Sequence, residues 1–205
     1  MIYITFPQFS FQNVNMMPII MGDISSVPES LQAYTPIIDL CHFRSGSTVY
    51  LTVTESIVEK GKTQRRPGIH TDATKNQNWG GGWGGKKIDR SGIFMASSDG
   101  RCRLWDEDTT DVDTHGGLLQ SPKGECILMK PNELYLMNDT TPHESLPALV
   151  TGPRQFFRLV SEDVGVWFSR HSTANPLGVT PSCQVVDENK FELLNIHSEN
   201  NIVGL

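Results

Sequence analysis

The sequence predicts a mainly β fold, a sandwich or barrel of short strands with a small helical segment before it. Glycine and proline, 18 and 12 of the 205 residues, interrupt the chain at short intervals and leave little room for long helices. Between these turn residues lie short runs rich in β-branched and aromatic residues, which favour strands. The length fits one domain, and we expect residues 1–205 to form it, with the barrel at about 48–170.

The predicted elements follow from local patterns along the chain. A helix is expected only after Pro28, over Glu29–Tyr34, with a weak continuation toward Cys41. The strands come after it, each bounded by turn residues such as the Ser-Pro-Lys-Gly run at 121–124. They are expected at residues 49–58, 92–96, 126–129, 133–137, 155–160 and 164–168. The polar segment after Gly178 has no pattern that predicts an element.

Composition and charge argue against several classes of function. The net charge is −6 and no basic run stands out, so we expect no nucleic-acid partner. No stretch is long and apolar enough to cross a bilayer, and the first residues lack the features of a signal peptide. We therefore expect no membrane partner and a cytoplasmic location. The four cysteines are scattered without a CxxC pair, which predicts reduced thiols rather than a zinc ribbon.

Three side chains form the pattern of a metal centre. His70 and Asp72 are two residues apart, so in an extended segment both point the same way, and His143 follows after a predicted strand and turn. Two imidazoles and one carboxylate hold one face of an octahedral iron and leave positions open for oxygen and another ligand. Arg154 carries a planar fork of donors that suits a carboxylate. The pattern predicts an Fe(II) site that uses O2 beside a bound carboxylate.

In this order, His70-x-Asp72, His143 and Arg154 resemble the Fe(II)- and 2-oxoglutarate-dependent dioxygenases. The resemblance covers about residues 50–160 and implies a double-stranded β-helix, the jelly-roll barrel of cupin-like proteins. It also implies that His70, Asp72 and His143 bind the catalytic iron. Arg154 would then pair with the distal carboxylate of 2-oxoglutarate.

The resemblance implies a reaction as well. 2-Oxoglutarate would be decarboxylated to succinate and CO2 while a small, polar or carboxylate-bearing metabolite is hydroxylated, desaturated or cyclised. Asp72 argues against halogenation, because related halogenases have a small residue in place of this carboxylate. Arg158 lies on the same strand face as Arg154 and matches a second arginine that some small-molecule oxygenases carry near the cosubstrate or an anionic substrate. The substrate itself and the oligomeric state stay open.

Two other functions explain part of the pattern. A non-catalytic jelly-roll binding module accounts for the strands and the acidic charge, but it makes the His70, Asp72 and His143 set a coincidence. A cupin-type metal dioxygenase that does not use 2-oxoglutarate keeps the metal and has no need of Arg154, which would then belong to an ion pair. Arg158 could likewise contact an anion or form a structural pair.

Two loops carry further candidates. The glycine-rich loop at 76–85 contains Trp79 and Trp83, which could cover a substrate as a lid or pack beneath the loop. The acidic loop at 106–115 ends in Asp113-Thr114-His115, a reversed pair that could offer a carboxylate and an imidazole, and it lacks the glycine and terminal glutamate of an EF-hand. We expect this second loop to be a solvated, charge-rich connection. The remaining histidines have no acidic partner two residues away and are expected to be structural or surface residues: His42, His171 and His197.

Overall fold

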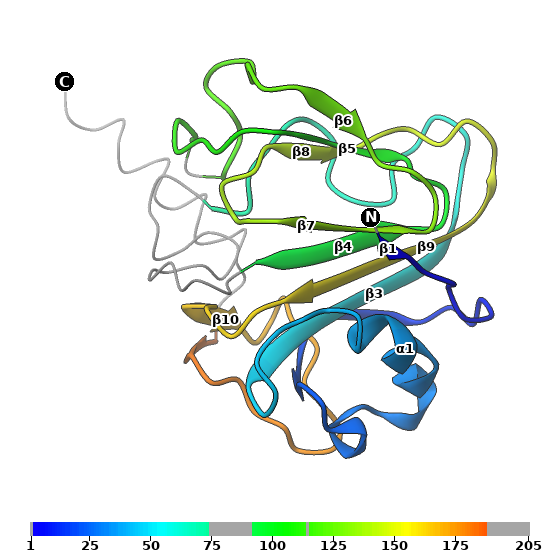
Figure 1. Cartoon of the computed structure of the whole chain (residues 1–205), viewed down its shortest axis with the longest axis vertical. Helices are drawn as coiled ribbons and strands as arrows, with labels where there is room; N and C mark the ends of the chain where they lie inside the picture. Colours follow the sequence, from blue (N-terminus) through cyan, green and yellow to red (C-terminus); the bar gives the residue numbers. More distant parts are fainter. Residues whose placement is uncertain (1, 74–91, 114, 188–205) are drawn as a thin grey trace.

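The computed structural model describes residues 2–73, 92–113 and 115–187, and these residues form a mainly β protein (Figure 1). The larger sheet contains β1 (Ile2–Tyr3), β2 (Asn13–Ile20), β3 (Thr48–Val58), β4 (Ile93–Ser97), β7 (Glu133–Met137) and β9 (Gly152–Val160). The smaller sheet contains β5 (Cys102–Trp105), β6 (Cys126–Leu128) and β8 (His143–Ser145). The strand orders are β1-β7-β4-β9-β3-β2 and β6-β5-β8, and all pairs within these two sheets are antiparallel.

The chain alternates between the two sheets, which is the connectivity of a double-stranded β-helix. β3, β4, β7 and β9 lie in the larger sheet, and β5, β6 and β8 between them in sequence lie in the smaller one. His70, between β3 and β4, joins the smaller sheet through an isolated bridge to His143 of β8. The predicted fold class, a mainly β jelly-roll barrel with a small helical N-terminal segment, is confirmed.

The larger sheet buries a different core on each face because alternate residues of a strand point to opposite sides. Leu51 of β3 and Phe157 of β9 pack with Tyr34 of the helical segment in one buried cluster. Tyr50 and Phe156, one position along the same strands, belong to a second cluster inside the barrel. The inner face of β9 is therefore the face of Phe156, and residues at even positions of this strand point into the barrel.

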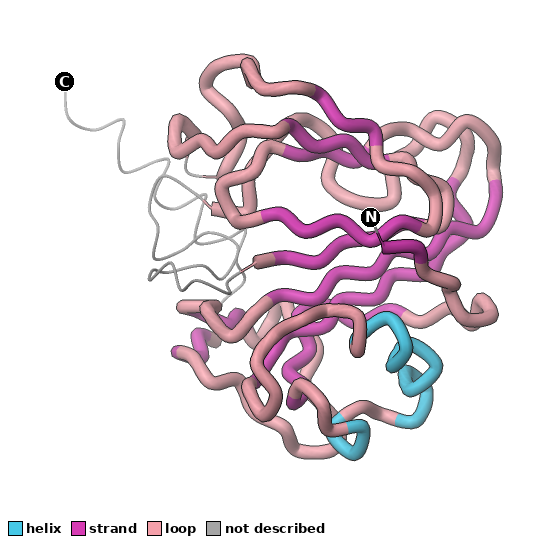
Figure 2. Tube along the Cα trace, in the orientation of Figure 1, coloured by secondary structure: helices cyan, strands magenta, loops and turns pink. Residues whose placement is uncertain are grey.

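The helical segment covers the outer face of the larger sheet (Figure 2). It consists of η1 (Ile24–Ser26), η2 (Glu29–Tyr34) and α1 (Thr35–Ile38). The helix expected at Glu29–Tyr34 is a 3₁₀ helix that continues as one α-helical turn, so its position is confirmed. Its α-helical part is short because Pro36 can begin a helix but the sequence supplies no long amphipathic run after it.

Five strands had no prediction, and the reasons are local. β2 contains Pro18, which is unfavourable inside a sheet, but β2 is an edge strand of the larger sheet. β5 and β8 have four and three residues, too short for an alternating pattern to stand out. β1 has only two residues, and β11 (Gln184–Val186) lies in the polar segment and pairs in parallel with β10 (Val166–Phe168). The loop at 76–85 with its two tryptophans lies outside the described residues.

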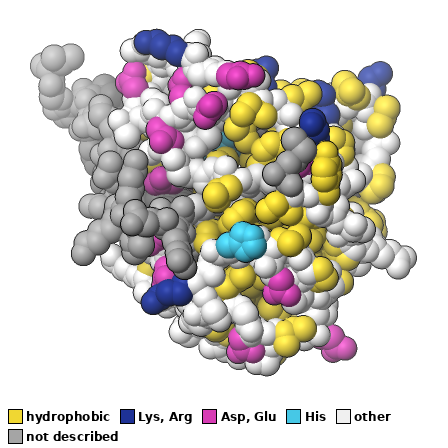
Figure 3. All heavy atoms as spheres, in the orientation of Figure 1, with side chains coloured by type: hydrophobic (Ala, Val, Ile, Leu, Met, Phe, Trp, Pro, Cys, Tyr) yellow, Lys and Arg dark blue, Asp and Glu magenta, His cyan; other side chains and the backbone are white. Residues whose placement is uncertain are grey.

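The surface agrees with the low density of positive charge in the sequence. On the face that Figure 3 shows, Lys and Arg side chains lie in separate places rather than in one continuous stripe. Among the described residues, no helix is long and apolar enough to span a membrane.

Candidate metal centre

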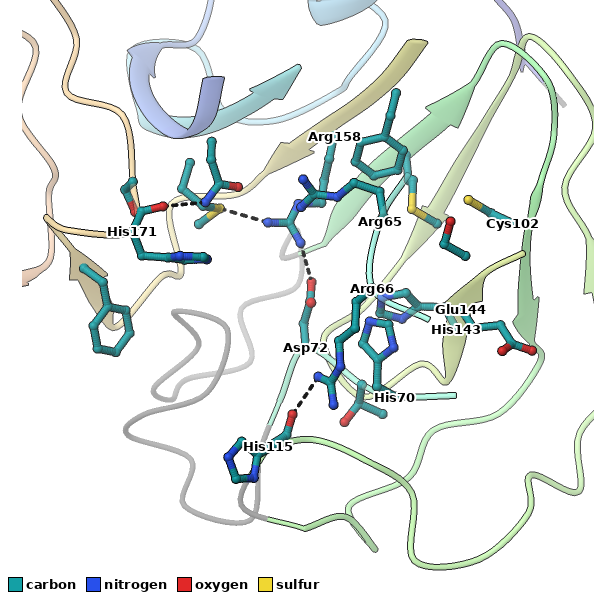
Figure 4. A pocket seen from close by; sticks show the side chains of 18 of the residues that line it. Arg65, Arg66, His70, Asp72, Cys102, His115, His143, Glu144, Arg158 and His171 are labelled. Atoms are coloured by element: carbon teal, nitrogen blue, oxygen red, sulfur yellow. Dashed lines mark hydrogen bonds and ion pairs between the residues drawn. The ribbon is translucent and has the colours of Figure 1, made fainter. Parts of the chain in front are cut away.

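A pocket of about 350 Å³ opens inside the barrel and contains three of the predicted ligands (Figure 4). Its walls come from the inner faces of β2, β4 and β9 on one side and from β5 and β8 on the other. The segment 65–72 and β10 complete it. The pocket therefore lies where the two sheets face each other, and residues far apart in the sequence meet there.

His70 and His143 lie directly opposite each other in this pocket. The backbone N–H of His70 donates to the carbonyl of His143 at 3.0 Å, and the N–H of His143 donates to the carbonyl of His70 at 2.9 Å. This reciprocal pair brings the two imidazole rings to a centroid distance of 4.4 Å. The backbone of the smaller sheet thus fixes the spacing of the two histidines.

Each imidazole is also fixed in rotation by a carbonyl two residues earlier in the chain. Nδ1 of His70 lies 2.7 Å from the carbonyl oxygen of Gly68, and Nδ1 of His143 lies 3.0 Å from that of Thr141. A carbonyl can only accept, so both Nδ1 atoms carry the proton and both Nε2 atoms keep a lone pair. Gly68 has a φ of 77°, a left-handed conformation that glycine adopts without strain.

Both rings are neutral at pH 7, which is the form that binds a metal. Burial and the neighbouring His143 ring lower the pKa of His70 to about 3. Burial also lowers the pKa of His143. Among the described residues no hydrogen bond engages the Nε2 atom of either ring, so both are available as ligands. A hydrogen bond from Nδ1 to a carbonyl is the usual support of a metal-binding histidine.

Asp72 lies in the same pocket but is turned toward an arginine. Its Oδ2 atom accepts from Nη1 of Arg158 at 3.0 Å, and the two side chains are only 12% and 13% exposed. Figure 4 shows the carboxylate pointing away from the two imidazoles toward Arg158. In the described part of the chain, no three His, Cys, Asp or Glu side chains converge as a metal-binding group. The structure thus brings the two imidazoles together and holds the carboxylate of Asp72 on the same pocket wall, paired with Arg158.

The donor set fits an Fe(II) ion. Two neutral imidazoles with free Nε2 atoms face one pocket, and a carboxylate lies on the wall of the same pocket. This composition is that of the two-histidine, one-carboxylate iron sites. To serve as the third ligand, the side chain of Asp72 would have to rotate away from Arg158.

Arg154 does not belong to this pocket. It is 1% exposed, and its Nε atom pairs with Asp99 at 2.9 Å. Its other nitrogens donate to the carbonyl of Arg101, the hydroxyl of Ser145 and the sulfur of Cys102. Ser145 and Cys102 line the pocket while Arg154 lies behind them, so its guanidinium serves the structure of the barrel.

Sequence reasoning passed over two arginines that line the pocket. Arg65 donates to the hydroxyl of Thr54 at 3.3 Å and lies 5.1 Å from the ring centroid of Phe156. Arg66 donates to the carbonyl of His115 at 2.7 Å. Neither forms an ion pair with a described carboxylate. Their positions in the sequence could have indicated this, because both directly precede the turn that leads to the candidate ligand His70.

Two further histidines line the pocket: His115, which was expected in a solvated acidic loop, and His171, which was expected to be a structural or surface residue. His115 lies at its rim, after a turn in which Asp113 accepts the N–H groups of His115 and Gly117 at 2.7 and 2.8 Å. His171 lies on the opposite wall, and its carbonyl accepts from Asn15 at 2.8 Å. Asp113 is thus engaged in a turn, as expected of a connection rather than of a calcium loop.

Comparisons with known proteins give distant structural matches. No protein-family model matches the sequence, and no curated protein matches it in a sequence search. The structure of hydroxypropylphosphonic acid epoxidase from S. wedmorenis with fosfomycin is 9% identical, with a TM-score of 0.30 over 55% of this chain and 43% of that chain. A structure of Fe(II) HppE is also 9% identical, with a TM-score of 0.29 over 55% of this chain and 43% of that chain. The non-heme monooxygenase ThoJ, in the apo form, is 11% identical, with a TM-score of 0.39 over 86% of this chain and 69% of that chain. The chain thus spans less than half the length of the epoxidase.

The prediction of an Fe(II)- and 2-oxoglutarate-dependent dioxygenase is wrong. The matched proteins are described as an iron-containing epoxidase and a non-heme monooxygenase, not as 2-oxoglutarate-dependent enzymes. In the structure itself, the residue assigned to the distal carboxylate of 2-oxoglutarate, Arg154, is buried behind the pocket and paired with Asp99. The predicted cosubstrate, 2-oxoglutarate, and its decarboxylation to succinate are therefore without support.

Proposed function

We propose that this protein is a non-haem iron oxygenase of the cupin type that oxidises a small molecule without 2-oxoglutarate. The observation that carries the proposal is the pair of His70 and His143, which are neutral, buried, locked at Nδ1 and free at Nε2 in one pocket. Two such imidazoles are costly to bury without a ligand, because each Nε2 lone pair lacks a hydrogen-bond donor among the described residues.

Each residue has a separate task in this proposal. His70 and His143 hold Fe(II) through Nε2, and Asp72 supplies the carboxylate ligand. The ion activates O2 when bound there and is the source of the oxidising chemistry. The carbonyls of Gly68 and Thr141 keep the two rings in the binding orientation. The apolar walls, among them Phe156 and Trp167, exclude water from the substrate.

A metal titration tests this proposal directly. We would strip the purified protein with a chelator and titrate it with Fe(II) under anaerobic conditions, following the heat of binding. We expect one ion per chain, and a loss of affinity of at least about 100-fold in His143→Ala. His42→Ala is the matched control, because His42 is exposed and lies outside the pocket.

Oxygen consumption by the loaded protein separates the two remaining functions. An oxygenase consumes O2 when a suitable substrate is supplied and needs no 2-oxoglutarate. If wild type and His143→Ala bind Fe(II) equally weakly, the iron centre is refuted and the non-catalytic binding module becomes the better description.

A further inference from the structure

The pocket has more positive than negative charge, although the whole protein is acidic. Arg65, Arg66 and Arg158 line it. Two carboxylates also line it, but that of Glu144 is paired with Arg103. Asp72 is then the lining carboxylate that acts on all three guanidinium groups, and Asp113 acts in addition on Arg66. A pocket with such an excess of arginine attracts an anion.

Arg158 is only partly satisfied by its present partners. Nη1 donates to Asp72 at 3.0 Å, and Nη2 faces the sulfur of Met16 at 3.3 Å, a weak acceptor. The Nε atom is buried and has no hydrogen-bond partner. A buried, unpaired donor on a charged group is costly, and an oxyanion that reaches Nε and Nη2 would remove this cost.

Arg65 lies next to Arg158 in the pocket (Figure 4). Burial and the neighbouring Arg158 lower the pKa of Arg65 to about 10, as expected for two guanidinium groups that repel each other. Like charges held close together inside a barrel are stabilised by an anion placed between them. Asp72 partly fulfils that role in the structure.

We propose that Asp72 occupies the place of the substrate's anionic group until a metal binds. In the structure its carboxylate pairs with Arg158. When Asp72 turns to the metal, Arg158 and Arg65 form a subsite for a small organic oxyanion, a carboxylate or a phosphonate. This inference rests on the proposed metal centre and adds to it the substrate class and the order of binding.

The physical reason for the order is competition for one carboxylate. Beside Arg158 the carboxylate of Asp72 points away from the two imidazoles, so binding the metal requires it to turn and leaves the guanidinium without its counter-ion. An anion that takes the vacated place then stabilises the metal-bound arrangement. By linkage, the metal raises the affinity for the anion, and the anion raises the affinity for the metal by the same factor.

The first experiment needs no metal. Chelator-treated wild type, Asp72→Asn and Glu162→Gln would each be titrated with methylphosphonate and with acetate by calorimetry. Asp72→Asn removes the internal anion, so we expect at least about tenfold tighter binding of one of the two probes, and the stronger probe identifies the headgroup. Glu162→Gln changes the net charge equally at an exposed ion pair with Arg44 and should behave as wild type.

The second experiment uses Zn(II), which cannot support turnover. Zinc-loaded wild type should bind the anion at least about tenfold more tightly than the metal-free protein, and Arg158→Gln should lose this gain while Arg44→Gln keeps it. Equal affinity in Asp72→Asn and wild type would overturn the inference. So would a zinc-dependent gain that persists in Arg158→Gln, because the anion would then bind the metal alone. If no zinc binds at all, the metal centre fails, and the metal-free comparison still decides the role of Asp72.

Discussion

Arg154 and Arg158 lie four residues apart on the inner face of β9, and each pairs with a different carboxylate. Arg154 pairs with Asp99 behind the pocket, and Arg158 pairs with Asp72 inside it. Four residues of a strand span about 13 Å, so one arginine reaches the pocket and the other does not. The two therefore have separate roles: Arg154 stabilises the barrel, and Arg158 belongs to the candidate site.

Removal of Arg154 is expected to affect folding rather than binding. Arg154→Ala leaves Asp99 without its ion-pair partner and a cavity behind Ser145, so the free energy of unfolding should fall by about 3 kcal/mol. Urea unfolding of the metal-free protein measures this. Arg44→Ala, at an exposed ion pair, is the control and should leave stability nearly unchanged. A stable Arg154→Ala protein would contradict the structural role.

The hydrogen-bond network at Glu55 predicts a dependence of stability on pH. Burial raises the pKa of Glu55, but hydrogen bonds from Tyr34, from the backbones of Gln12 and Ser10 and from Gln155 together lower it below its usual value. A carboxyl whose pKa is lowered by folding stabilises the protein above its unfolded pKa. This contribution disappears as the pH falls through the lower folded value.

Glu55→Gln tests this linkage. At pH 7 the substitution should lower the free energy of unfolding by about 2 kcal/mol, because the charged acceptor is lost. The difference from wild type should shrink as the pH falls below about 4.5, where the wild-type carboxyl begins to bind a proton in the unfolded state. Urea unfolding across this pH range measures it. A difference that is constant with pH would show that Glu55 acts through packing alone.

Gly116 positions the segment that carries Asp72. It has a φ of 79°, and a Cβ atom there would lie 2.4 Å from the carbonyl oxygen of Thr71 and 2.8 Å from that of Ala73. Gly116→Ala should therefore displace Asp72 and weaken metal binding by about tenfold or more. Gly178→Ala is the matched control, because Gly178 has a φ of 82° and open space around its Cβ position. It should cost about 1 kcal/mol of stability and leave metal affinity unchanged.

The absence of a 2-oxoglutarate function can be tested by spectroscopy. Anaerobic protein loaded with Fe(II) should show no visible metal-to-ligand charge-transfer band when 2-oxoglutarate is added. Oxygen consumption with a suitable substrate should be the same with and without 2-oxoglutarate. A band that appears when 2-oxoglutarate is added to the wild-type protein would restore the cosubstrate.

Much of the fold could be predicted because the signals are local. The alternating run at residues 49–58 identified β3, and turn residues around Glu133–Met137 identified β7 to the residue. β5 and β8 were missed because strands of three or four residues are stabilised by their neighbours in the sheet rather than by their own pattern. The same holds for the edge strand β2 with its proline.

The sequence by itself determined the residue types of the site and three of the strands around it, β4, β9 and β10. The His70-x-Asp72 spacing, the later His143 and the alternation of β9 all follow from the order of residues. Side chains of a strand alternate between its two faces, so the sequence places Arg154 and Arg158 on the same face of β9. It does not distinguish which of the two arginines reaches the pocket.

Only the tertiary structure decided which arginine reaches the pocket and which carboxylate each one meets. Asp99 and Asp72 are 55 and 86 residues from their partners, and their contacts depend on how the two sheets close around the core. The pairing of His70 with His143 also arises from closure of the smaller sheet. Strand periodicity specifies a face, but the position of a residue along the barrel is set by packing between distant segments, which is why the site's electrostatics emerged only in the folded protein.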